Sequence, residues 1–157
     1  MKKVILAVAL AAFSGSLFAE TLTASGSVTT SCSFSNTAAG TLAISDTAVT
    51  TSSAPTTDVL NNDSAVYDVT VGNQALSAPV GVSVFAVDVQ NSSRPAGATA
   101  IFSSSSEADG ASANLASAGT YVMAADFTAT LASTATAGNY VATVDLTCAP
   151  AGGGGEF

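Results

Sequence analysis

Histidine and tryptophan are absent from the 157-residue chain, and lysine and arginine together number only three. Without histidine the chain has no Ser–His–Asp or Cys–His system, and it lacks the commonest metal ligand and general base. Two cysteines without histidine cannot complete a tetrahedral zinc site. Without tryptophan, an aromatic platform for stacking sugars is hard to build. We therefore expect a protein that is not an enzyme and that carries no metal or cofactor.

The only two lysines lie in residues 1–19, which have the pattern of a secretory signal peptide. Lys2 and Lys3 precede an apolar stretch that is too short to span a bilayer, and small residues lead to a cleavage position after Ala19. No later stretch is long enough to span a membrane in the mature form. We therefore predict a secreted protein that reaches the extracellular surface via the periplasm.

Removal of residues 1–19 leaves Arg94 as the only basic side chain against eleven acidic ones. Such a surface cannot neutralise nucleic-acid phosphates, and anionic membrane surfaces repel it for the same reason. Nucleic acid is therefore excluded as a partner.

Pairs of carboxylates remain the one option for acid–base catalysis or calcium binding. They fall into two groups along the chain: Asp58, Asp63 and Asp68, and Glu107 with Asp109. Their spacing does not match an EF-hand. We therefore interpret these acids as solvated side chains of loops.

Alternation of apolar and polar residues predicts β-strands at both ends of the mature chain. The clearest apolar row lies near the C-terminus: Tyr140, Ala142, Val144, Leu146 and Cys148. A matching row near the N-terminus contains Cys32, the only other cysteine. Because export permits disulfides and the cysteine count is even, we predict a bond between Cys32 and Cys148 that ties the first strand to the last.

Further short strands are predicted between these two ends. The predicted strands cover residues 21–34, 41–50, 65–71, 80–90, 99–103, 120–131 and 138–148. A slip of the apolar row predicts a bulge near Val84 and Phe85. Residues 51–63 and 104–119 are predicted to form long polar loops. Seven to eight short strands without an amphipathic helix indicate an all-β fold, an antiparallel immunoglobulin-like β-sandwich, with a barrel as the alternative.

The domain organisation follows from these patterns. Residues 1–19 form the signal peptide, residues 20–148 form a single β-sandwich domain, and residues 149–157 form a flexible Gly-rich tail. The GGGGEF ending resembles a linker, so it is left out of the fold argument.

Two segments resemble secreted pilin-type subunits, namely chaperone–usher fimbrial subunits and spore-coat-U-like pilins. AGNYVATVDLTC (residues 137–148) resembles their final strand, and GSVTTSCSFSNTAAGTLAI (residues 26–44) resembles their opening. The chain differs from these families in two ways. Their disulfide usually joins early strands, whereas the second cysteine here lies in the last one. The C-terminal aromatic ending that a periplasmic chaperone grips is replaced by APAGGGGEF.

The resemblance implies polymerisation by donor-strand exchange, in which residues 20–30 complete the sheet of the next subunit. The inserted side chains are Leu22, Ala24, Gly26 and Val28. The partners implied are further copies of the chain, with a periplasmic chaperone or an outer-membrane assembly protein. The alternative is that residues 20–30 are simply the chain's own first strand.

We therefore predict a structural subunit of a bacterial surface filament or coat that assembles through an N-terminal strand. A monomeric extracellular binding module or adhesin is the alternative function. It would use the two polar loops predicted at residues 51–63 and 104–119.

Overall fold

The computed structural model describes residues 31–62, 67–102 and 106–151. Within these ranges the chain forms nine strands, joined in antiparallel ladders, and no helix. The strands are β1 (Cys32–Ala38), β2 (Thr41–Ile44), β3 (Ala48–Ser53), β4 (Thr56–Asn61), β5 (Tyr67–Ser77), β6 (Val82–Ser93), β7 (Ser112–Leu115), β8 (Gly119–Leu131) and β9 (Val141–Pro150). The all-β class is confirmed. The count of seven to eight strands was too low, because segments predicted as single strands or loops divide further.

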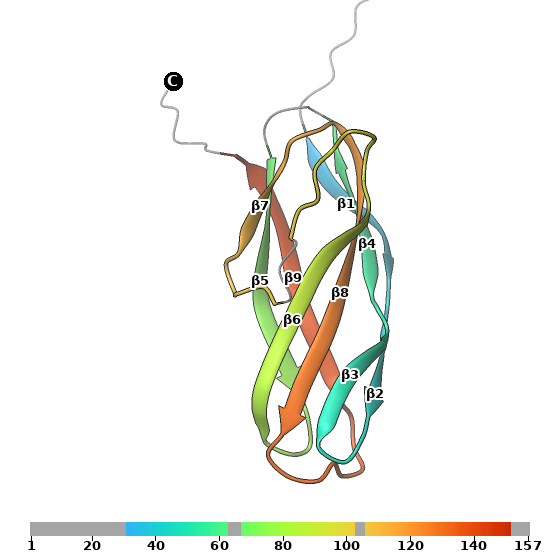
Figure 1. The fold of residues 1–157 in the computed structure, drawn as a ribbon, viewed down its shortest axis with the longest axis vertical. Helices are drawn as coiled ribbons and strands as arrows, with labels where there is room; N and C mark the ends of the chain where they lie inside the picture. Colours follow the sequence, from blue (N-terminus) through green and yellow to red (C-terminus); the bar gives the residue numbers. More distant parts are fainter. Residues whose placement is uncertain (1–30, 63–66, 103–105, 152–157) are drawn as a thin grey trace, which may run out of the picture.

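The larger sheet is built around β8 (Figure 1). One edge of β8 pairs with β6 along most of its length. The other edge is shared, because β4 pairs with the half that begins at Gly119 and β3 pairs with the half around Ala129. β1 pairs with β4, and β2 pairs with β3, so this side of the sheet ends in two short strands placed end to end.

The smaller sheet has the strand order β7-β5-β9. β9 pairs with β5 from Tyr67 to Ser77, with a register shift between Gly72 and Ala75. β7 pairs only with the first four residues of β5, Tyr67–Thr70. Beyond Thr70, that edge of β5 bonds instead to the connection between β6 and β7.

The two sheets bury their facing apolar rows against each other. β8 supplies the longest row, in which every second side chain is buried: Tyr121, Met123, Ala125, Phe127, Ala129 and Leu131. Val69 and Val71 of β5 are fully buried in the same cluster, which joins the layers. Phe85 of β6 stacks on Phe127 with ring centroids 6.2 Å apart. The row predicted for residues 120–131 is confirmed.

The disulfide predicted between the two ends of the domain is confirmed. Cys32 in β1 bonds Cys148 in β9, with the two Cα atoms 6.2 Å apart. Both cysteines are half-buried and pack against the main core cluster. The bond therefore links the larger sheet to the smaller one.

Several boundaries differ from the prediction in the first third of the domain. The predicted first strand ended at residue 34, whereas β1 continues to Ala38, and the predicted strand at 41–50 is the hairpin of β2 and β3. The predicted polar loop at 51–63 was wrong, because it contains the end of β3 and all of β4. Val59 in that segment is fully buried and lies between Phe34 and Tyr121 in the sheet.

Other differences follow the chain. The strand predicted at 65–71 continues as β5 to Ser77, and the predicted loop at 104–119 contains β7. The predicted strand at 99–103 forms no ladder in its described residues. The bulge in β6 lies between Val82 and Val84, close to the position predicted. β9 continues two residues past Cys148, to Pro150.

Several predicted features lie outside the described residues. They are the signal peptide (1–19), the inserted side chains Leu22, Ala24, Gly26 and Val28, and the end of the Gly-rich tail (152–157). In the three described ranges, no helix has the length and apolar character needed to cross a membrane.

Candidate functional site

A two-layer β-structure has two lateral sides, where the edges of its sheets face each other, and here the two sides differ. On the first side the connection between β6 and β7 lies between the layers. Glu107 N donates to Val87 O of β6 over 2.7 Å. Gly110 N donates to Val71 O of β5, and Val71 N donates to Ala111 O, both over 2.8 Å. One segment therefore makes backbone hydrogen bonds to both sheets and closes this side.

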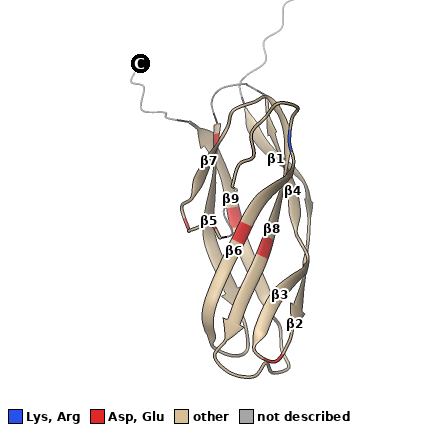
Figure 2. Ribbon diagram, in the orientation of Figure 1, with Lys and Arg blue, Asp and Glu red and all other residues tan. Residues whose placement is uncertain are grey.

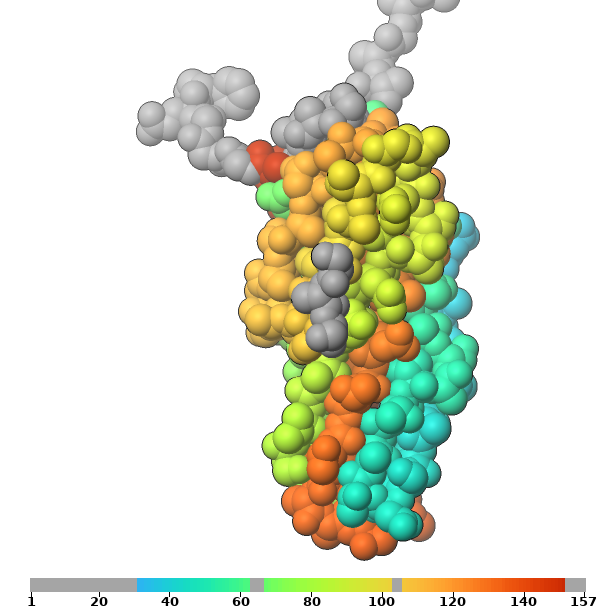
Figure 3. Space-filling view, in the orientation of Figure 1, coloured from blue at the N-terminus to red at the C-terminus, as the bar shows by residue number. Residues whose placement is uncertain are grey.

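Apolar side chains of the same connection fill the space beneath it. Ile101 and Phe102 are 6% and 9% exposed, and both belong to the main core cluster. Asn91 Oδ1 accepts a hydrogen bond from Ile101 N over 3.0 Å, which fixes the segment against β6. In Figure 3 its yellow and orange atoms cover the upper part of this face. We refer to the described residues of this connection, 94–102 and 106–111, as the closing segment.

The second lateral side lies between β9 and the end-to-end pair of β1 and β2. Among the described residues β9 pairs only with β5, β1 only with β4, and β2 only with β3. No ladder in this part of the chain joins β9 to either short strand. An edge strand of this kind presents a row of unpaired N–H and C=O groups that another strand can pair with. We call β9 and the end-to-end pair of β1 and β2 the two lips of this side. The Cys32–Cys148 disulfide links the two lips covalently.

Two hollows lie between these lips, with volumes of about 530 and 630 Å³. The first extends from Phe34 and Leu146, next to the disulfide, toward the middle of the molecule. The second extends to Ile44 and Tyr140. Pro55, Phe127 and Ala142 line both hollows, so together they form one groove along the second side. We call its two ends the disulfide end and the far end.

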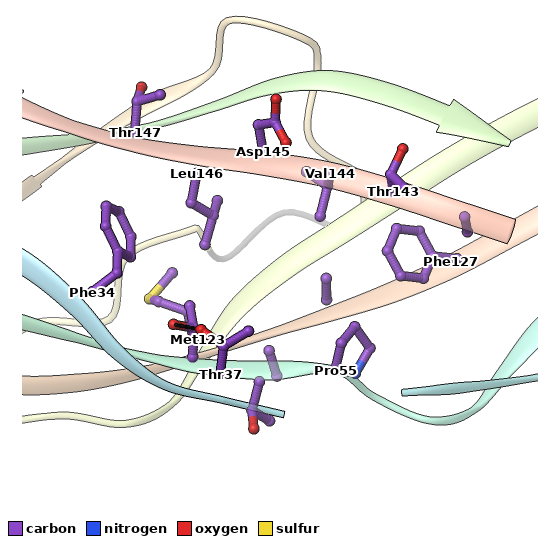
Figure 4. A pocket seen from close by; sticks show the side chains of 15 residues that line it. Phe34, Thr37, Pro55, Met123, Phe127, Thr143, Val144, Asp145, Leu146 and Thr147 are labelled. Carbon is purple, nitrogen blue, oxygen red and sulfur yellow. Dashed lines mark hydrogen bonds between the residues drawn. The ribbon is translucent and has the colours of Figure 1, made fainter. Parts of the chain in front are cut away.

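The groove is lined mainly by apolar side chains of the inward rows. Figure 4 shows Val144 and Leu146 of β9 pointing into it, while Thr143, Asp145 and Thr147 point away. Phe34 points in from the opposite lip, and Phe127 lies between the lips. The row on β9 that the sequence predicted to be buried is only half-buried, because no strand of the described residues covers the edge of β9 away from β5.

Phe34 and Ile44 are 39% and 44% exposed, although both face inward. The inward orientation of both side chains follows from the strand pairing. Phe34 lies opposite Val59 and Ile44 lies opposite Val49, and both valines are buried. Side chains directly opposite each other in a ladder share one face of the sheet. Their exposure follows from the groove beside them, which no described residue fills.

The lip formed by β1 and β2 bends at Gly40, halfway along the groove. A Cβ atom at this position would collide with the Pro55 ring and with the Ser53 carbonyl oxygen. Glycine therefore allows the lip to lie directly against the connection between β3 and β4. Ala125 N donates to Pro55 O over 3.2 Å, which anchors that connection to β8.

The acidic residues singled out from the sequence do not gather at one place. Asp58 lies in β4 and accepts a hydrogen bond from Asn36, while Asp68 lies in β5 of the other sheet and accepts one from Asn114. Asp63 is outside the described residues. Glu107 and Asp109 belong to the closing segment. Within the described ranges, no group of three or more Cys, Asp or Glu side chains is arranged to hold a metal ion.

A different acidic pair lies on the outer face of the larger sheet, where Asp88 of β6 is directly opposite Asp126 of β8. Figure 2 shows the two acidic positions side by side. Burial raises the pKa of Asp88 above its usual 3.8, and the charges of Asp126 and then Glu107 raise it further. The pair is a local electrostatic cost, not a ligand set.

The loops assigned to the alternative binding module are not free loops. Residues 51–61 are almost entirely β-strand, and residues 106–115 either bond to both sheets or form β7. The groove was missed in the sequence, although its lining was visible there as alternating rows. What the rows could not indicate was which of them would lack a neighbouring strand.

Comparison of the chain with protein-family models, with curated proteins and with solved structures gives no match.

Proposed function

We propose that the protein is a secreted, non-enzymatic structural subunit of a bacterial surface filament, built on an immunoglobulin-like sandwich with one strand position empty. The observation that carries the proposal is the groove between β9 and the lip of β1 and β2. It combines an apolar floor with two free strand edges, which are the features that β-strand addition requires. The closed first side of the same domain supports this interpretation.

The occupant we propose is the N-terminal segment, residues 20–30. Its alternating residues Leu22, Ala24, Gly26 and Val28 offer small and apolar side chains at every second position. The segment has about the same length as β9, which has 10 residues. A strand of that length extends about 33 Å, so one segment suffices to fill one groove.

The donor is a second copy of the chain. Ser31 continues the ladder of β1 past its first residue, because Asn62 N donates to Ser31 O over 3.2 Å and Ser31 N donates to Asn62 Oδ1 over 2.6 Å. The chain that precedes Ser31 thus joins the domain at the disulfide end, in line with β1. To fill its own groove it would need to reverse direction there and pass the disulfide.

An unfilled groove leaves apolar side chains exposed before assembly. We therefore include a periplasmic chaperone or an outer-membrane assembly protein as a temporary partner. The disulfide fits an oxidising location such as the periplasm or the cell exterior.

The test compares the mature chain, which begins at Glu20, with a variant that lacks residues 20–30. We expect filaments in electron microscopy and a high-mass peak in size-exclusion chromatography only for the longer chain. Val28→Asp should also abolish assembly, because it places a charge in the apolar groove. The matched control Thr29→Asp changes the neighbouring, outward position and should still assemble.

A mature chain that stays monomeric would contradict the proposal. So would a variant without residues 20–30 that still forms filaments. A monomer that loses stability when the segment is deleted would identify residues 20–30 as the chain's own strand.

A further inference from the structure

We propose that the Cys32–Cys148 disulfide is a fixed stop at one end of the groove, which sets the register of the strand that fills it. The inference rests on the function proposed above and specifies which residue of the donor strand lies opposite which residue of β9. It also gives a role to the position of the disulfide, which ties the two lips of the groove together.

The distance between the lips at the disulfide leaves no room for another strand. The Cα atoms of Cys32 and Cys148 are 6.2 Å apart. Neighbouring strands lie about 4.8 Å apart, so a strand inserted between two others separates them by about 9.6 Å. An occupant therefore cannot pass the level of the disulfide. The lining of the first hollow agrees, since it reaches Phe34 and Thr147 but neither cysteine.

The far end of the groove has no such covalent closure. There the connection between β8 and β9 approaches the turn between β2 and β3, with a hydrogen bond from Ala135 N to Asp46 O over 2.6 Å. The second hollow nevertheless continues to Ile44 and Gly138. The groove is thus closed by a covalent bond at the disulfide end only.

This asymmetry fixes the direction of the donor. Its N-terminus is free after cleavage, whereas residue 30 leads into a whole second domain that must stay outside the groove. The free end therefore fits against the disulfide, and the attached end leaves at the far end. The donor then runs antiparallel to β9, which runs from Val141 toward Cys148.

Register follows from counting along β9 from the stop. Between the disulfide and the far end, this part of the chain runs from Tyr140 to Thr147. Every second side chain faces inward, which gives four inward positions. With Glu20 stopped against the disulfide and Thr21 at the level of Thr147, the pairs are Leu22 with Leu146, Ala24 with Val144, Gly26 with Ala142, and Val28 with Tyr140. Every inserted side chain then meets an inward position, and Gly26 lies where Phe127 and Pro55 line both hollows.

The test adds two residues to the donor at either end. One variant of the mature chain retains Phe18 and Ala19 before Glu20, and its matched control carries the same two residues between Thr30 and Ser31. A photoreactive benzoylphenylalanine at position 22 reports the register by mass spectrometry of the cross-linked filament. In the native chain and in the control we expect cross-links to Phe34 or Leu146 of another copy.

The N-terminal extension should push the donor away from the stop. We expect its cross-links to move toward Val144 and its assembly to slow by about tenfold, because the Glu20 carboxylate then takes the apolar position at Leu146 and Val28 leaves the groove. In Cys32→Ser/Cys148→Ser the extension should be tolerated and the cross-links should stay at Leu146.

Each outcome of the extension experiment decides one of the two proposals. An extended chain that assembles at the native rate with unshifted cross-links would overturn the stop, whether or not the disulfide-free variant folds. A native chain that cross-links between copies but to neither Phe34 nor Leu146 would overturn the register. If no variant cross-links between copies, the proposed function itself fails.

Discussion

The two lateral sides of this domain differ in how the apolar space between the sheets is covered. Both expose the apolar space between two sheets, which must be covered if its side chains are to leave water. On the first side the closing segment covers it with Ile101 and Phe102, which are almost fully buried. On the second side the chain provides a disulfide at one level and leaves Phe34 and Ile44 exposed. The unfilled space is therefore confined to one side of an otherwise well-covered core.

β8 and β9 show the same contrast within single strands. In both strands every second residue is apolar over most of the length. β8 has neighbours on both edges and buries its whole inward row, whereas β9 has a neighbour on one edge and buries its row only partly. Burial of an alternating row thus depends on the neighbouring strands as much as on the row itself.

The largest expected effect comes from removing the covalent link on the open side. The disulfide closes a loop with a sequence separation of 116 residues. In the chain-entropy model, Cys32→Ala/Cys148→Ala should lower the free energy of unfolding by about 4–5 kcal/mol. Urea unfolding followed by circular dichroism measures the loss. Reduction of the native protein is the control, and a loss below about 1 kcal/mol by both routes would mean that non-covalent contacts already hold the lips together.

A matched pair of isoleucines compares the two sides directly. Ile101→Ala on the closed side creates a cavity in the core, so it should cost about 3 kcal/mol of stability. Ile44→Ala on the open side removes a side chain that is 44% exposed, so the monomer should lose less than about 1 kcal/mol. Urea unfolding of dilute, monomeric protein measures both values.

In an assembly assay, Ile44→Ala should have the larger effect and Ile101→Ala the smaller one. Ile44→Ala should slow filament formation, because its side chain lines the second hollow. Ile101→Ala should leave the assembly rate of the folded fraction unchanged. Equal losses of stability for the two variants would remove the distinction between a closed and an open side.

The smallest expected effect concerns Asp88, beside the closing segment. Its folded-state pKa is raised above 3.8, so the folded protein binds the proton more tightly than the unfolded chain. Stability therefore falls as pH rises from about 3.8 through the folded-state pKa. Asp88→Asn should remove this loss and add about 0.5 kcal/mol at pH 7, the size expected for a like-charged cross-strand pair.

Thermal or urea unfolding between pH 3 and pH 7 measures the Asp88→Asn effect, and the gain should disappear at the acidic end. Asp126→Asn should give a smaller gain, because it removes the repulsion but leaves Asp88 partly buried, and the two gains should not add fully. Asp46→Asn, in the exposed turn after β2, is the control without a change.

Much of this fold follows from strong alternation in the sequence. The rows of β8 and β9 and the Cys32–Cys148 bond were all predicted, because each depends on a long, regular pattern or on a residue type that occurs twice. β4 was missed, since Thr, Asp and Asn around one buried Val59 resemble a loop until their pairing with β1 and β8 defines the strand. Ile101 and Phe102 suggested a strand, yet they fill the closed side instead. The groove could not be predicted, because the order of strands in a sheet decides which edge stays free.

The position of β8 also has a consequence for how the chain folds. β3, β4 and β6 all pair with a strand that begins only at Gly119, and β1 is linked to Cys148. Few contacts of the larger sheet are therefore local in sequence. Domains of such high contact order fold on the scale of milliseconds to seconds, and their unpaired strands are open to aggregation meanwhile. The strands in the first half of this chain therefore cannot complete their sheet until β8, in the second half, is available to pair with them.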